Sequence, residues 1–144
     1  MAQVNAYLTF NGNCEEAFGF YKSVFGGEFR VISRFKDMPA MPGATLPEAA
    51  GQKIMHVSLP ISKETILMGS DANPMFGDVP IGKNISLSVG ADSKEEAGRI
   101  FNALAVGGQI TMPIADTFWN AYFGMLVDKY NIIWMVNYDL PKQD

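Results

Sequence analysis

Few side chains in this sequence are of the types that usually carry chemistry, and they lie apart along the chain. His56 is the only histidine among the 144 residues. Because histidine titrates close to neutral pH, it suits proton transfer or contact with a ligand. The same ring also serves as a hydrogen-bonded structural group, and the sequence leaves both roles open. We therefore take His56 as the candidate catalytic residue and as a candidate ligand contact.

The single cysteine and the aspartates favour structural roles. Cys14 is expected in the first turn of a helix, where the helix dipole can lower the pKa of a thiol. The chain has no second cysteine, however, and no histidine near Cys14 in sequence, which favours a small residue close to the cap. Asp128 precedes Lys129-Tyr130-Asn131 and is expected to close a hairpin. Neither paired carboxylates nor a nucleotide or serine-hydrolase motif is visible.

Aromatic and sulfur-containing side chains offer an apolar surface. Met68, Trp119, Phe123 and Met135 fall within predicted strands or beside them. Residues of these types can line a pocket for a small molecule, and they are equally typical of a plain core. Both interpretations stay open at the level of sequence.

Composition narrows the class of partner. The chain is 48% hydrophobic and 18% charged, as in globular proteins. A net charge of -4 argues against nucleic acid, because phosphate binding needs clustered lysine and arginine. The apolar stretch Ile132 to Val136 is far shorter than a membrane span, and the first residues lack the pattern of a signal peptide. We expect a cytoplasmic protein with no membrane partner.

The chain also repeats itself. Residues 13–27 and residues 93–108 share Glu-Glu-Ala and end in Gly-Gly, and Glu15 and Glu95 lie 80 positions apart. Each stretch predicts a helix that follows a capping pattern, with Asn13 or Ser93 as the N-cap. The predicted apolar stripes are equivalent at every position; they contain Ala17, Phe20, Tyr21, Val24, Phe25 and Ala97, Ile100, Phe101, Leu104, Ala105.

Strand signals flank both helices in the same order. Alternating and β-branched runs predict strands at residues 4–10, 28–35, 54–61, 65–69, 84–89, 109–112, 122–128 and 132–138. The segment 37–53 contains three prolines and is interpreted as a mobile flap. The sequence thus predicts one α+β domain with two β-α-β-β-β modules, at about residues 4–70 and 84–138, that arose by internal duplication.

The order of these motifs resembles the vicinal oxygen chelate superfamily, which includes glyoxalase I, extradiol dioxygenases and the bleomycin and fosfomycin resistance proteins. Within it the chain is similar to the PhnB-like branch. The resemblance rests on residues 10–17 with Phe20-Tyr21, Ile54-Met55-His56, Gly69-Ser70-Asp71, Thr117-Phe118-Trp119, Phe123-Gly124, Asp128 and Trp134-Met135-Val136-Asn137. It implies a glyoxalase-like fold, in which the modules form an incomplete barrel with a ligand cleft, and a homodimer.

The resemblance also indicates where a metal would bind. Metal-dependent members hold a divalent ion with histidine or glutamate from the first and last strands of each module. Alignment on Phe20-Tyr21 places these four positions near Asn5, Met68, Asn84 and Met135. Neutral amides and thioethers are poor ligands for the usual ions of such sites. We therefore expect no metal and no other cofactor.

Three possibilities follow, one of which is that the chain has lost its ligand and acts through an interaction surface. The first is a metal-independent small-molecule-binding protein whose ligand contacts Asn5, His56, Met68, Asn84, Trp119, Phe123 and Met135. The alternative is a lyase, isomerase or dioxygenase with an atypical or missing metal site, so the sequence leaves enzymatic activity undecided. PhnB-like sequences sometimes carry a ubiquinone methyltransferase label. A Rossmann-type cofactor site needs a glycine-rich turn after a parallel strand, whereas Gly26-Gly27 and Gly107-Gly108 follow predicted helices, so methyl transfer is not expected.

Overall fold

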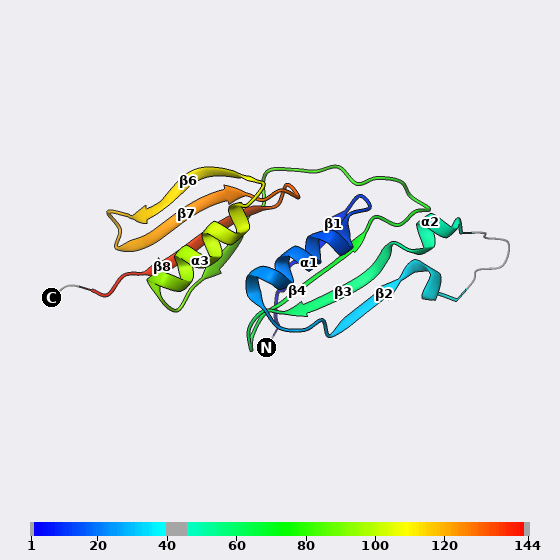
Figure 1. Cartoon of the computed structure of the whole chain (residues 1–144), viewed down its shortest axis with the longest axis horizontal. Helices are drawn as coiled ribbons and strands as arrows, with labels where there is room; N and C mark the ends of the chain where they lie inside the picture. The colour runs from blue at the N-terminus through cyan, green and yellow to red at the C-terminus, as the bar shows by residue number, and fades with distance from the viewer. Residues whose placement is uncertain (1, 40–45, 143–144) are drawn as a thin grey trace. The chain divides into compact units, whose positions relative to one another are not determined.

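The computed structural model describes residues 2–39 and 46–142. The chain divides into two compact units, Met1–Pro80 and Ile81–Asp144. Each unit contains one four-stranded sheet and one helix of 12 residues (Figure 1). No helix in the described part of the chain has the length and apolar character needed to cross a membrane.

Unit 1 carries a mixed sheet with the strand order β1-β4-β3-β2. Strand β1 runs parallel to β4, and the other neighbours are antiparallel. The helix α1 connects β1 to β2, and two short helices, η1 and α2, precede β3. The bounds are β1 Tyr7–Phe10, α1 Cys14–Phe25, β2 Val31–Arg34, η1 Phe35–Asp37, α2 Glu48–Gly51, β3 Ile54–Pro60 and β4 Ile66–Asp71.

Unit 2 has the same topology, with the strand order β5-β8-β7-β6 and a single parallel pair, β5 with β8. Its elements are β5 Leu87–Gly90, α3 Lys94–Ala105, β6 Gln109–Asp116, β7 Ala121–Val127 and β8 Ile133–Asp139. The β3–β4 and β7–β8 hairpins also share their register, since Ser58 lies opposite Met68 and Met125 lies opposite Met135, each 67 residues further along. The predicted α+β class, with a β-α-β-β-β order in each unclosed sheet, is confirmed.

Each helix packs over one face of its own sheet (Figure 1). The buried side of α3 is the predicted one, with Ala97, Ile100, Phe101 and Leu104. The prediction for α1 was wrong for Phe20 and Phe25, which are only half-buried, whereas Phe18 is buried. The reason lies in the sheet: Phe18 packs over Gly69, where an added Cβ would lie 2.7 Å from its ring.

The two helices begin differently, although both were predicted to start with a capping box. The Ser93 Oγ accepts a hydrogen bond from the backbone N–H of Glu96 at 3.0 Å, as expected. Asn13 occupies the N-cap position of α1, but its side chain makes no capping bond. Instead the Asp71 carboxylate, from the end of β4, accepts a hydrogen bond from the N–H of Cys14 at 2.9 Å. A residue distant in sequence has therefore replaced the local cap.

Several strands differ in length from their prediction, because a ladder extends only where a partner strand lies opposite. Strand β1 begins at Tyr7, since the Asn5 side chain, rather than the backbone, accepts the N–H of Ile66 at 3.3 Å. Strand β5 begins at Leu87, and β6 continues to Asp116 opposite β7. The segment 37–53, predicted as a flap, begins at the last residue of η1 and contains α2, and its residues 40–45 lie outside the described residues.

Candidate functional site

Each sheet has one face beneath its helix and one face that the helix leaves uncovered, which we call the helix-free face. In unit 1, Gly69 points toward α1, so its neighbours Met68 and Ser70 point to the other side. The strand register extends this face across the sheet, because residues opposite one another on paired strands share a side. The face contains Tyr7, Thr9, Val31, Ser33, His56, Ser58, Met68 and Ser70.

His56 meets Tyr7 on this face. The Tyr7 hydroxyl lies 3.3 Å from the His56 Nδ1, although 49 residues separate the two in sequence. The two rings are stacked, with centroids 5.7 Å apart and an angle of 23° between their planes. Tyr7 is 47% exposed and His56 is half-buried, so the pair is accessible from this face of unit 1.

The helix-free face of unit 2 is more apolar. Gly124 points toward Phe101 of α3, which places Phe123 and Met125 on the opposite side. Met135 lies opposite Met125, and Trp119 contacts Phe123 with ring centroids 5.9 Å apart. Trp119 is 51% exposed, so this aromatic surface is open in unit 2.

The structure therefore brings together two subsets of the predicted ligand contacts. His56 and Met68 share a face in unit 1, and Trp119, Phe123 and Met135 share one in unit 2. Asn84 is exposed and precedes the start of β5 at Leu87. Sequence reasoning missed Tyr7, although the period-two alternation of its strand would have placed it on the same side as Asn5 and Thr9.

The matching registers of the β3–β4 and β7–β8 hairpins make several of these positions in unit 1 equivalent to positions in unit 2. The shift of 67 residues that superposes β3–β4 on β7–β8 pairs Met68 with Met135, and it pairs His56 with Phe123. The equivalent positions thus keep a thioether in both units but carry an imidazole only in unit 1. The imidazole of the candidate site therefore belongs to unit 1.

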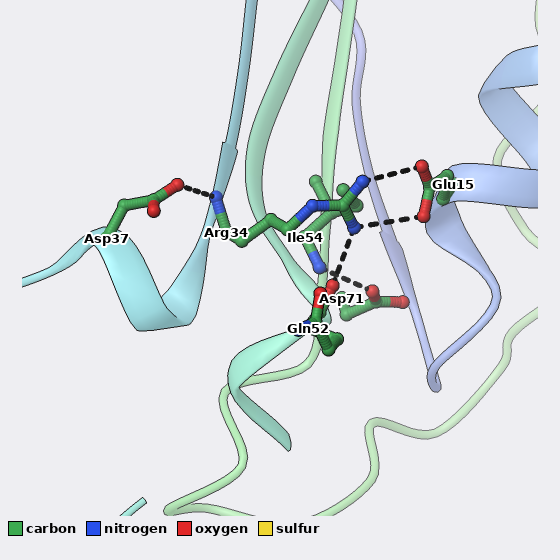
Figure 2. A network of polar contacts seen from close by, with 6 residues as sticks. All are labelled: Glu15, Arg34, Asp37, Gln52, Ile54 and Asp71. Carbon is green, nitrogen blue, oxygen red and sulfur yellow. Dashed lines mark hydrogen bonds and ion pairs between the residues drawn. The ribbon is translucent and has the colours of Figure 1, made fainter. Parts of the chain in front are cut away.

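A second polar cluster in unit 1, formed around Arg34, joins separate elements (Figure 2). Arg34 donates two hydrogen bonds to the Glu15 carboxylate, at 2.9 and 2.7 Å, and one to the backbone carbonyl of Gln52 at 2.7 Å. The Asp37 carboxylate accepts the backbone N–H of Arg34. The hydrogen bond from Arg34 lowers the pKa of Glu15 below its ordinary value. Since the Arg34 guanidinium holds β2, α1 and the end of α2 together, we assign it a structural role.

Asp71, Asp128 and Cys14 have structural roles, which the sequence favoured for Asp128 and Cys14 but did not predict for Asp71. Asp71 is 3% exposed and accepts the backbone N–H groups of Gly12, Cys14 and Ile54, at 3.0, 2.9 and 2.8 Å. The Asp128 carboxylate accepts two N–H groups of its hairpin and the indole N–H of Trp134, at 2.8 to 3.0 Å. Burial raises the pKa of the Cys14 thiol far above its ordinary value, so this thiol is not an activated nucleophile.

Unit 1 also contains a hollow that the sequence did not predict. Its volume is about 590 Å³, and none of the predicted site residues lines it. The lining is largely apolar and comes from η1, α2 and the loop after β4; it includes Phe35, Met38, Leu46, Pro74, Met75 and Phe76.

Comparison with known proteins places the chain in a family. The model of the family described as 3-demethylubiquinone-9 3-methyltransferase matches residues 2–137. The chain belongs to this family, the PhnB-like branch of the vicinal oxygen chelate superfamily. A PhnB protein from Bacillus cereus, described as a putative 3-demethylubiquinone-9 3-methyltransferase, is 29% identical with a TM-score of 0.70, and the match covers 95% of this chain and 99% of that one.

Two further relatives match nearly the whole chain. Protein PA1353 from Pseudomonas aeruginosa is 41% identical over 98% of this chain and 100% of its own, with a TM-score of 0.84. Protein YjdN from Escherichia coli K12 is 32% identical, with 93% of each chain covered. The superfamily fold itself is shared with a glyoxalase/bleomycin resistance protein/dioxygenase domain from Frankia, at 13% identity and a TM-score of 0.70, over 99% of this chain and 96% of that one.

The four residues that the resemblance places at the superfamily's metal positions have donor groups that suit a divalent ion poorly. The donors near those positions are the amides of Asn5 and Asn84 and the thioethers of Met68 and Met135. The Asn5 amide oxygen already accepts the N–H of Ile66. Among residues 2–39 and 46–142, no group of three or more histidine, cysteine or acidic side chains is placed to hold an ion. We derive no step through a metal.

Proposed function

We propose that this chain is a metal-independent small-molecule-binding protein, with candidate ligand contacts on the helix-free face of unit 1 and on that of unit 2. The observation that carries the proposal is the mixture of side chains on these faces. In unit 1, the ring of Tyr7 and the thioether of Met68 share a face with one imidazole. In unit 2, Trp119 and Phe123 provide aromatic surface. Apolar walls with a few placed polar groups are the usual composition of ligand sites.

Methyl transfer, which the family description names, receives less support from the geometry. In a Rossmann-type cofactor site, a helix follows a parallel strand, and the N–H groups at the N-terminus of that helix are free to bind a phosphate or ribose of the ligand. Gly12 does stand between β1 and α1, but the N–H groups of Gly12 and Cys14 are already bound to Asp71. Each sheet also contains only one parallel pair. These features favour ligand binding without that cofactor.

The first test is a thermal-shift screen of small oxygenated and aromatic compounds. A ligand present at 100 times its dissociation constant stabilises the folded state by about 2.7 kcal/mol. If the ligand binds unit 1, we expect the thermal shift to disappear in Met68→Arg, which places a charge on the helix-free face of that unit. If the ligand binds unit 2, we expect it to disappear in Met135→Arg. Met75→Arg is the matched control, because Met75 is 68% exposed and lines the hollow instead. A shift that only Met75→Arg abolishes would assign the ligand to the hollow and refute the proposal.

Metal independence has a separate test. Elemental analysis of protein purified without chelator should find no stoichiometric divalent ion. One ion per chain, lost in Asn5→Ala or Met135→Ala, would contradict the proposal and support the alternative of a lyase, isomerase or dioxygenase with an atypical site.

We further propose a cytoplasmic homodimer in which residues 4–70 and 84–138 are duplicated modules. The common strand order and hairpin register support duplication. A single free, buried cysteine is compatible with a reducing compartment. Sedimentation at micromolar concentration tests the dimer, and a purely monomeric species would contradict it. Cell fractionation tests the location.

A further inference from the structure

We propose that Tyr7 holds His56 in the tautomer that carries its proton on Nε2, so that His56 donates a hydrogen bond to a carbonyl oxygen of a neutral ligand. The ligand part of this inference rests on the proposed binding function. Its tautomer part concerns the protein alone. Tyr7 is the positioning residue, and His56 is the residue that contacts the ligand.

The tautomer follows from the contact between the two rings. The Tyr7 hydroxyl oxygen lies 3.3 Å from His56 Nδ1, which is within hydrogen-bonding range. A neutral imidazole has one donor nitrogen and one acceptor nitrogen. The phenol is the more acidic donor and the imidazole nitrogen the more basic acceptor, so the stronger arrangement has the hydroxyl donating to Nδ1. The proton of the ring then resides on Nε2.

The ring stacking reinforces this arrangement. With centroids 5.7 Å apart and planes inclined by only 23°, the Tyr7 ring restricts the orientation of the imidazole. Hydrogen bonding at one ring nitrogen is the usual means by which proteins fix the role of the other. In the described part of the chain, no hydrogen bond to His56 Nε2 is found, so this nitrogen remains available to a ligand.

The chemistry of the surrounding face indicates the class of ligand. His56 has Ser33 opposite it on β2, and on the same face Thr9 of β1 lies opposite Ser70 of β4, toward the other edge of the sheet. Met68 lies opposite Tyr7. None of the residues assigned to the helix-free face of unit 1 is lysine, arginine, aspartate or glutamate. Because an anion is costly to desolvate without a cationic partner, this face favours a neutral acceptor, and the carbonyl oxygen is the simplest one.

The tautomer can be measured directly because His56 is the only histidine. Imidazole ¹⁵N and ¹³Cδ2 chemical shifts of the neutral ring distinguish the two tautomers without assignment ambiguity. We expect the Nε2–H form to predominate in the wild-type protein and a mixture in Tyr7→Phe. Tyr138→Phe is the matched control, since it removes a hydroxyl from unit 2. An Nδ1–H form in the wild-type protein, or unchanged shifts in Tyr7→Phe, would overturn the positioning role.

The ligand class is tested with acetophenone and ethylbenzene, which differ at the carbonyl group. Loss of one neutral hydrogen bond corresponds to about a three- to tenfold change in affinity. We expect acetophenone to bind more tightly than ethylbenzene by this factor, and the preference to disappear in His56→Phe, which installs the residue found at the equivalent position in unit 2. Equal affinities, tighter binding of benzoate, or no binding of any probe would refute the ligand class. Other compounds whose binding Met68→Arg abolishes would still support the proposed function, so the two failures are distinguishable.

Discussion

The stability of unit 1 should depend strongly on the buried carboxylate of Asp71. One oxygen accepts the N–H groups of Gly12 and Cys14, and the other accepts the N–H of Ile54. In Asp71→Asn the side chain keeps its size, but one oxygen becomes an amide group that cannot accept. At least one of the three N–H groups then loses its partner.

The size of the effect can be estimated from these contacts. A buried donor left without an acceptor costs about 1–3 kcal/mol, and hydrogen bonds to a charged group are stronger than those to a neutral one by about 1 kcal/mol. Because such terms are not additive, we expect Asp71→Asn to lower the free energy of unfolding by about 3 kcal/mol. At about 2–4 °C per kcal/mol, the midpoint of thermal unfolding should fall by about 6–12 °C.

The assay should report on unit 1 rather than on unit 2. Both tryptophans, Trp119 and Trp134, belong to unit 2, so urea unfolding should be followed by far-ultraviolet circular dichroism as well as by fluorescence. Asp78→Asn makes the same chemical change at an exposed residue and should alter stability by less than about 0.5 kcal/mol. If Asp71→Asn were no more destabilising than Asp78→Asn, the assigned role of the Asp71 carboxylate would be wrong.

Three further predictions concern packing, pH and thiol reactivity. Gly69→Ala should destabilise the protein by about 1–3 kcal/mol in urea unfolding, because its Cβ would clash with α1. Gly19→Ala lies on an open surface of α1 and should stabilise the protein by about 0.5–1 kcal/mol. If Gly19→Ala were the more destabilising of the two, this packing would be contradicted. The wild-type protein should be more stable than Glu15→Gln, and this difference in free energy of unfolding should be largest above pH 4.5, the ordinary pKa of a glutamate. The difference should vanish as the pH falls through the lowered pKa of Glu15, since protonation removes its ion pair with Arg34. A difference that grows in acid would refute that pairing. Cys14 should react with Ellman's reagent only after denaturation, because it is fully buried; rapid reaction of the folded protein would show that the thiol is accessible.

The sequence by itself determined the two long helices and the strands and their order, although it did not predict the short helices η1 and α2. The apolar stripe of α3 and the capping bond of Ser93 were predicted correctly, because both depend on residues within one or two helical turns. Period-two patterns likewise located the strands and so the α+β class. The candidate His56 was identified by its residue type alone.

The tertiary structure decided what depends on partners distant in the chain. Phe18 replaces Phe20 in the core because α1 packs over a glycine of β4. Asp71 takes over the cap of α1 from 57 residues away, and Tyr7 meets His56 across 49 residues. Strand limits at Tyr7 and Leu87 depend on where a neighbouring strand supplies hydrogen-bonding partners. Local patterns specify the conformation of a segment, but only the folded chain brings an acceptor, a ring or a glycine from another segment within contact distance.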